Sequence, residues 1–311
     1  MWQNTAIALT SLAAFIAGLR VMRAGMDGLA AGKMVALLQR MVRSPTRGIL
    51  TGAFVTALLQ SSSAITAITV GLVASGSMTF RNAIGVILGS NVGSTVTPQL
   101  LSLNLWGLVI PCLLLGIFLF IFARQRWLHW SMALIGFSLI FIALQCLERS
   151  VAPLTTTSTF RQTIIGATHH LDLTILIGCL ASAMVQSSTA ITVMAMAITA
   201  DGGMTVRSGI ALVLGANIGT CVTSVIASIG MSRASKQAAL SHVLLNVGGV
   251  LLFLPFLSPF AAWLAHSSSN PAQQVANAHT LFNLICTLLL WPFVSPFATL
   301  IERLLPNQSE T

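Results

Sequence analysis

Charged side chains are scarce in this chain, and their scarcity excludes most classes of protein. Among 311 residues there are 15 Lys or Arg and 6 Asp or Glu, together 7% of the total, whereas a soluble domain carries about 25%. Hydrophobic residues make up 55% of the chain and occur in successive apolar runs of membrane-spanning length. A cytosolic enzyme, a secreted module and a disulfide scaffold are therefore excluded. So is an outer-membrane barrel, whose strands alternate polar and apolar residues. The composition indicates an all-α polytopic membrane protein.

Motifs for chemical catalysis and for transition metals are also missing from the sequence. The five cysteines form no CxxC pair and have no histidine at metal-ligand spacing, so we expect free thiols. Neither GxSxG nor HExxH occurs. We therefore expect neither an enzyme nor a protein with a cofactor. The net charge of +9 fits the excess of Lys and Arg in cytoplasmic loops of membrane proteins, and it does not indicate nucleic-acid binding.

What the sequence does contain is an internal duplication at an offset of 126 residues. Residues 52–97 align without a gap on residues 178–223, and about 20 of the 46 aligned positions are identical. The matched cores are QSSSAIT, from Gln60, with QSSTAIT, from Gln186, and GSNVGS with GANIGT. A repeat of this kind predicts two structurally equivalent units.

Each unit contains one apolar stretch whose length matches neither one membrane crossing nor two. Residues 48–75 and 173–200 are each 28 residues long, which is too long for one crossing of about 20 residues and too short for two crossings with a turn. Each stretch has its polar cluster near the middle. We expect each to form a re-entrant helical hairpin whose polar tip lines a cavity near the centre of the membrane.

Seven further apolar segments complete the expected topology. Each unit then has three crossings and one hairpin, and this odd number of crossings inverts the second unit relative to the first. We expect a first repeat at 1–128, a second at 129–265, and a final helix with a short tail at 266–311. The expected crossings are 5–22, 82–103, 105–123, 129–148, 209–230, 237–265 and 276–301.

The positions of the basic residues agree with this topology. With the N-terminus outside, 12 of the 15 Lys and Arg residues lie on the cytoplasmic side, as expected for a protein of the plasma membrane. Treating both hairpins as full crossings changes the division only slightly, so segment length is the stronger argument. Arg20, Arg23 and Asp27 are expected to form a charge cluster at the cytoplasmic end of the first helix.

The polar motifs have two interpretations each. Three consecutive hydroxyls after Gln60 or Gln186 exceed what one helix-packing face needs, which favours a binding site. Their oxygens suit Na⁺, and their O–H groups, with the free N–H groups of a half-helix, suit an oxyanion. The GxNxG elements around Asn91 and Asn217 are either close-packing glycines or breaks in discontinuous helices with ion-coordinating groups; we favour the breaks.

The doubled Gln-Ser-Ser-Ser/Thr-Ala-Ile-Thr, each followed by GxNxG, resembles the sodium-phosphate cotransporter family over roughly residues 10–300. The resemblance implies Na⁺-coupled transport of inorganic phosphate by alternating access, in a multi-pass protein of the bacterial inner membrane, with Na⁺ as the coupling ion. Thr189 replaces the third serine of the motif and keeps its hydroxyl. The expected phosphate and sodium site comprises Gln60, Ser61, Ser62, Ser63, Thr66, Asn91, Ser94, Thr95, Gln186, Ser187, Ser188, Thr189, Thr192, Asn217 and Thr220.

Several alternatives stay open. Neither hairpin core contains a charged side chain, so we expect bound Na⁺ to supply the positive charge that phosphate needs. An exporter or channel for oxyanions without obligatory Na⁺ coupling would use the same residues. His242 with Asn246, and His279 with Asn283, have an Hx₃N spacing that favours interhelical hydrogen bonds, with proton coupling as the alternative. Membrane lipids are expected partners, and association of several copies is left open.

Overall fold

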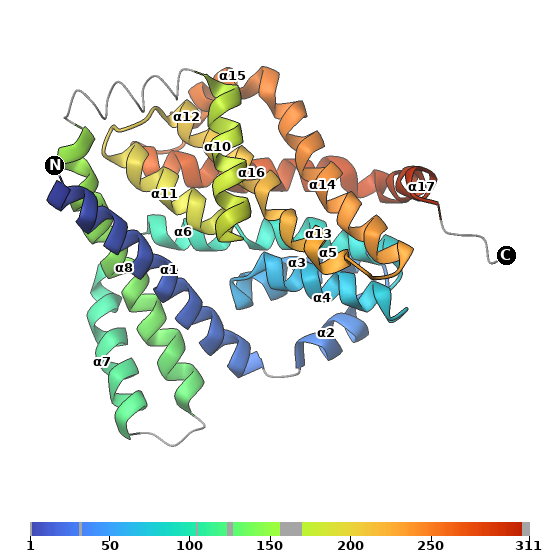
Figure 1. Cartoon of the computed structure of the whole chain (residues 1–311), viewed down its shortest axis with the longest axis horizontal. Helices are drawn as coiled ribbons and strands as arrows, with labels where there is room; N and C mark the ends of the chain where they lie inside the picture. Colours follow the sequence, from blue (N-terminus) through green and yellow to red (C-terminus); the bar gives the residue numbers. More distant parts are fainter. Residues whose placement is uncertain (1, 31–32, 104, 123–126, 156–169, 307–311) are drawn as a thin grey trace.

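The computed structural model describes residues 2–30, 33–103, 105–122, 127–155 and 170–306 (Figure 1). These residues form α-helices with short 3₁₀ turns, and the described part of the chain contains no strand. The expected all-α class is confirmed. The helix bounds are α1 Trp2–Ala30, α2 Lys33–Met41, α3 Pro45–Leu59, α4 Ser62–Ala74, α5 Phe80–Gly93, α6 Val96–Ser102, α7 Trp106–Phe122, α8 Leu128–Thr155, α10 Leu171–Val185, α11 Ser188–Ala200, α12 Val206–Thr220, α13 Val222–Ser228, α14 Arg233–Phe253, α15 Leu257–Leu264, α16 Pro271–Leu290 and α17 Val294–Leu304.

The sequence duplication reappears in the positions of the helices. Helices α8, α10, α11, α12 and α13 begin 126 residues after α1, α3, α4, α5 and α6, respectively. Helix α14 begins 127 residues after α7. The short breaks between α3 and α4 and between α10 and α11 are therefore equivalent. Helices α3, α4, α10 and α11 have 13 to 15 residues each, fewer than the roughly 20 that a crossing requires.

Five described helical segments are long and apolar enough to cross a membrane: Ala6–Ala30, Leu128–Leu147, Val206–Ser228, Arg233–Leu264 and Pro271–Leu304. A sixth is possible only if Phe80–Ser102 and Trp106–Phe122 are taken together, and these two are bent by 104°. The sequence predicted seven crossings, two of which lie within residues 82–123. By length and hydropathy the described helices provide five crossings, or six if the bent pair counts as one. The first segment also differs, because α1 continues to Ala30 instead of ending near residue 22.

Helices α1 and α8 pack against each other in antiparallel directions. Gly25 lies against the backbone of His129 and Ala133, whereas Gly18, two turns earlier, lies against Gly136 and Ile140. Helix α7 packs on α8, and these three helices form a group at one side of the molecule in Figure 1. Each unit therefore contributes its first helix to one shared, antiparallel pair.

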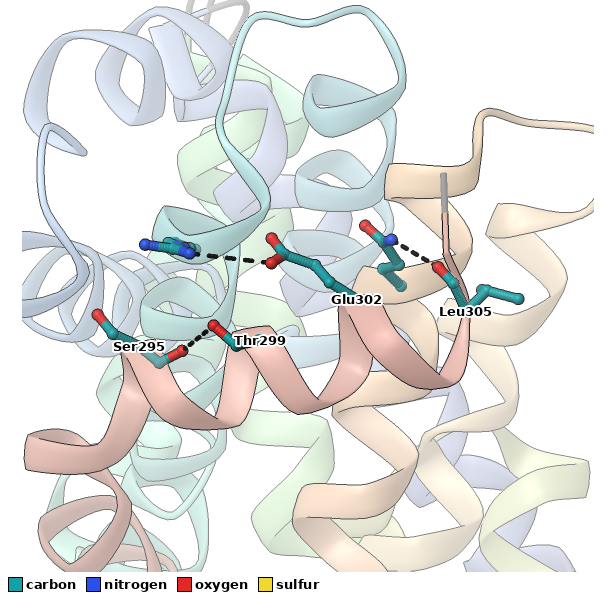
Figure 2. Close-up of polar contacts among 6 residues, drawn as sticks. Ser295, Thr299, Glu302 and Leu305 are labelled. Carbon is teal, nitrogen blue, oxygen red and sulfur yellow. Dashed lines mark hydrogen bonds and ion pairs between the residues drawn. The ribbon is translucent and has the colours of Figure 1, made fainter. Parts of the chain in front are cut away.

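The amphipathic helix α17 is attached to the rest of the bundle by polar contacts (Figure 2). Glu302 Oε2 lies 3.8 Å from Arg81 Nη2, and both side chains are partly exposed. The backbone oxygen of Leu305 accepts a hydrogen bond of 2.7 Å from Gln237 Nε2. Within α17, Thr299 Oγ1 donates to the oxygen of Ser295 at 3.2 Å. These contacts join the last helix to residues near the starts of α5 and α14.

Candidate substrate and ion site

The two polar tips have the same backbone conformation. Gln60 and Gln186 end their helices in the left-handed region, with φ of 59° and 55°, and they are the two non-glycine residues with positive φ in the described chain. A side chain in this region costs about 1 kcal/mol or more. Ser61 and Ser187 then begin the next helices, because each hydroxyl accepts a hydrogen bond from the amide three residues later. The QSS sequence thus breaks one helix and begins another.

The tips of the two repeats contact each other directly. Ser63 Oγ donates a hydrogen bond of 3.0 Å to the backbone oxygen of Gln186. Arg23, on α1, donates from Nε to the backbone oxygen of Gln60 at 2.7 Å and from Nη2 to Ser187 Oγ at 3.3 Å. One arginine therefore joins both tips, and 123 residues of chain separate the tip residues in contact.

The position of Arg23 extends one prediction and corrects another. Arg23 interacts electrostatically with Arg20 and Asp27, as expected of the charge cluster, but it is also half-buried and contacts the tips, whereas the other two side chains are exposed. The binding site was expected to lack a charged side chain; both hairpin cores do lack one, but α1 brings Arg23 to them. The physical reason is the length of α1, whose last two turns carry Arg23 into the protein. The sequence contained one signal that could have pointed to Arg23: an arginine, Arg149, occupies the equivalent position in the second repeat.

Behind each tip lies a layer of buried hydroxyls that pair differently in the two repeats. In the first repeat, Thr66 Oγ1 lies 3.5 Å from Ser90 Oγ. In the second repeat the equivalent of Ser90 is Ala216, and the buried Thr192 Oγ1 has no hydrogen-bond partner. At a second pair of equivalent positions, the hydroxyl is paired in the second repeat and unpaired in the first. Ser182 Oγ pairs with Thr220 Oγ1 at 3.0 Å, whereas Thr56, the equivalent of Ser182, has an unpartnered buried Oγ1.

Three of the buried side-chain oxygens without a hydrogen-bond partner belong to residues in the tips or about one turn from them. They are Thr56 Oγ1, Thr192 Oγ1 and Gln60 Oε1; Asp201 Oδ2 and Thr223 Oγ1, further from the tips in sequence, also have no partner. Buried oxygens without a partner are rare in native proteins and call for an explanation, and neutral oxygen ligands are those that Na⁺ takes in transporters. Within the described residues, no group of three or more His, Cys, Asp or Glu side chains can hold a metal ion. Hydroxyl and amide oxygens of this kind are chemically suited to Na⁺.

The glycines of the two GxNxG elements pack helices together. A Cβ atom on Gly89 would lie 2.0 Å from the backbone oxygen of Ile49, and one on Gly215 would lie 1.9 Å from that of Ile175. These two glycines therefore pack closely, and each helix is also interrupted at the end of its element, as the favoured interpretation expected. The interruptions come directly afterwards, at Ser94–Thr95 between α5 and α6 and at Cys221 between α12 and α13.

The asparagines of these elements contact the two Hx₃N pairs, which lie on α14 and α16. Asn91 Nδ2 donates to Asn246 Oδ1 at 3.3 Å, and Asn217 Oδ1 lies 3.4 Å from His279 Nε2. His242 Nδ1 lies 3.0 Å from Ser224 Oγ. The interhelical hydrogen bonds that the Hx₃N spacing favoured are therefore present.

The expected site residues fall into three groups. At the contact between the tips lie Gln60, Ser61, Ser62, Ser63, Gln186, Ser187, Ser188 and Thr189; in the hydroxyl layer behind them lie Thr66 and Thr192; near the helix interruptions lie Asn91, Ser94, Thr95, Asn217 and Thr220. Sequence reasoning missed Arg23, Thr56, Ser90 and Ser182. A cavity of about 220 Å³ borders Gln60, but apolar side chains form most of its lining. In this conformation the polar tips close against each other.

The fold and the site define a multi-pass helical membrane protein built from two equivalent units. The family model described as Na⁺/Pi-cotransporter matches the chain twice, at residues 14–149 and 151–285. The chain belongs to this family. Its members are transporters and not enzymes, and phosphate is the substrate that the family implies. The double match agrees with the duplication seen in the sequence and in the helix bounds.

Three relatives illustrate the range of similarity. "Uncharacterized protein YqeW" of Bacillus subtilis is 32% identical over 258 residues, covering 83% of this chain and 84% of the relative. "Putative inorganic phosphate export protein YjbB" of Salmonella typhimurium is 27% identical over 81% of this chain and 47% of its own length. This chain thus spans about half of that relative. "Sodium-dependent phosphate transport protein 2A" of Oryctolagus cuniculus is 36% identical over 98 residues, covering 30% of this chain and 15% of the relative. No solved structure matches the chain.

Proposed function

We propose that this protein transports inorganic phosphate together with Na⁺ by alternating access, with both bound between the two Gln-Ser-Ser tips. The observation that carries the proposal is the convergence of both tips and Arg23 through three hydrogen bonds. The site then lies where the two repeats meet, so that movement of one repeat against the other exposes it to either side of the membrane.

Phosphate has three kinds of donor at this position. The guanidinium of Arg23 has five N–H donors in a planar fork that matches an oxyanion, and two nitrogens are already directed at the tips. The hydroxyls of Ser62, Ser63 and Ser188 lie at the same junction. The first amides of α4 and α11 have no partner within their helices, and the helix dipoles place partial positive charge there.

Sodium supplies the remaining charge. One arginine neutralises only half of a phosphate dianion, and an uncompensated charge in a low-dielectric site costs several kcal/mol. The buried, unpartnered oxygens of Gln60, Thr56 and Thr192 belong to a tip or to a residue about one turn from a tip, and they carry no charge themselves. A Na⁺ ion bound by them and a phosphate bound by Arg23 therefore stabilise each other, which couples the two binding events.

The topology that we propose has the two repeats inverted in the membrane, with a re-entrant hairpin in each. Two observations support it. The equivalent helices α1 and α8 pack in antiparallel directions, as two copies related by an axis in the membrane plane would. The segments α3–α4 and α10–α11 break at their centres at a polar residue, where a straight crossing would be continuous.

A second candidate function is phosphate export without obligatory Na⁺ coupling. It is favoured by Arg23, because a fixed positive charge at the tips reduces the need for a co-bound cation. The relative YjbB carries export in its printed name. In both candidates the same residues bind phosphate, and they differ only in whether a cation must accompany it.

The deciding experiment is uptake of radiolabelled phosphate into proteoliposomes containing the full chain. We expect an inward Na⁺ gradient to accelerate uptake at least tenfold over a K⁺ gradient of the same size. A pH gradient imposed without Na⁺ tests proton coupling through His242 and His279. Uptake that responds to neither gradient would favour the exporter, and no phosphate flux under any condition would contradict the proposal.

A further inference from the structure

Among the described residues, Arg23 is the arginine that contacts the tips, and its counterpart in the second repeat takes no part in these contacts. Arg149 on α8 lies 126 residues after Arg23 on α1. Its side chain is exposed, whereas that of Arg23 donates to Gln60 O and Ser187 Oγ. A surface arginine needs no special explanation by itself. For Arg149, however, the other tip offers the repeat equivalents of the two oxygens to which Arg23 donates.

The repeat defines what the counterpart contacts would be. Gln186 is the equivalent of Gln60, and Ser61 is the equivalent of Ser187. An arginine that repeats the role of Arg23 would therefore donate to Gln186 O and Ser61 Oγ. In this structure Ser63 Oγ already donates to Gln186 O.

Each tip carbonyl thus has two equivalent donors in the sequence. Gln186 O accepts Ser63 here and can accept Arg149, whereas Gln60 O accepts Arg23 here and can accept the hydroxyl of Thr189, the counterpart of Ser63. Thr189 is buried beside the tip, and the replacement of serine by threonine keeps the hydroxyl. The contacts at the two tip carbonyls in this structure are therefore not related by the repeat.

The two arginines lie toward opposite ends of the α1–α8 pair. Antiparallel packing places Gly25 against Ala133 and Gly18 against Gly136, so Arg149 lies beside the early part of α1. At 1.5 Å per residue the two arginines are about 24 Å apart along the pair, because Arg23 lies level with about residue 133 of α8. The α1–α8 pair therefore carries one of the two equivalent arginines toward each of its ends.

Resting on the proposed function, we propose that Arg149 is a second substrate-positioning residue, which replaces Arg23 at the tips when the transporter opens to the opposite side. In that state Arg149 donates to Gln186 O and Ser61 Oγ, Thr189 takes Gln60 O, and Arg23 becomes exposed. Phosphate then meets an arginine from either side of the membrane.

Transport gives the first test. In proteoliposomes of fixed orientation, Arg149→Gln is expected to raise the half-saturating phosphate concentration about tenfold on one face, and Arg23→Gln on the other. Arg149→Lys is expected to restore part of the loss. Arg207→Gln, another exposed arginine, is the control and should leave both faces unchanged. An Arg149→Gln variant with wild-type affinity on both faces would overturn the proposal while leaving the proposed function intact.

The second test does not depend on transport. Phenylglyoxal modifies accessible arginines, and peptide mass spectrometry measures the modified fraction at Arg23 and Arg149 in the purified full chain. Ser63→Ala frees Gln186 O, so it should protect Arg149 and increase modification of Arg23 severalfold. Thr189→Val should keep Arg23 protected. If the two arginines do not change in opposite directions in Ser63→Ala, the exchange does not occur, whatever the protein transports.

Discussion

Gln60 and Gln186 have equivalent left-handed conformations, yet the carbonyl oxygen of Gln60 accepts Arg23 and that of Gln186 accepts Ser63. Gln60 is half-buried and Gln186 is exposed. The backbone of the two repeats is thus nearly symmetric, whereas their polar contacts are not. A duplicated motif thus specifies the break in the helix, whereas the surrounding helices decide which hydrogen-bond partner each tip has.

The largest expected effect tests what the repeats share. Gly89→Ala and Gly215→Ala each place a Cβ within about 2 Å of a backbone oxygen, so both should destabilise the protein by several kcal/mol. Thermal unfolding of the purified protein is the measurement. Gly71→Ala, with open space around the added methyl group, is the control and should be neutral or slightly stabilising. Unequal losses at the two positions would show that the packing symmetry is incomplete.

Arg23→Gln tests the contact that the repeats do not share in this conformation. Losing a hydrogen bond from a charged donor costs about 1.5–3 kcal/mol, so phosphate transport should fall about 10- to 100-fold. Arg20→Gln, an exposed arginine one turn earlier on α1, is the matched control and should transport normally. Equal effects of both substitutions would indicate that α1 contributes only general positive charge.

Replacing the tip glutamines separates side chain from backbone. Gln60→Gly and Gln186→Gly keep the left-handed conformation, which glycine adopts freely. Both variants should abolish transport if both amides bind substrate or ion. Stability should differ, because Gln60 Nε2 also donates to the backbone oxygen of Ala57, and its loss costs about 1 kcal/mol. A stable Gln60→Gly variant with normal uptake would remove this tip from the site.

The smallest effect concerns the hydroxyl layer. Thr192→Val removes a buried oxygen without a partner, so thermal stability should be unchanged or higher by up to about 1 kcal/mol. If the oxygen binds Na⁺, the Na⁺ concentration for half-maximal uptake should rise severalfold. Thr66→Val removes a paired hydroxyl and should instead lower stability slightly. Ala216→Ser supplies a hydroxyl partner for Thr192, so the second repeat should gain the hydrogen bond that Thr66 and Ser90 form in the first.

Much of the architecture follows from the sequence. The duplicated blocks predicted equivalent helices, and the centres of residues 48–75 and 173–200 predicted the breaks that occur at Gln60 and Gln186. Predictions failed where the partner is distant in sequence. Arg23 is separated from Ser187 by 164 residues, and no local pattern in α1 encodes that contact.

The sequence by itself determined the membrane class, the two repeats, the position of each polar tip and the family resemblance, because hydrophobic length and internal identity are properties of the chain order. Only the tertiary structure decided that the tips contact each other, that Arg23 joins them and that Arg149 does not. The physical reason is that charge at a site depends on which helices converge there. A segment without charged residues can still meet a charge that another helix carries.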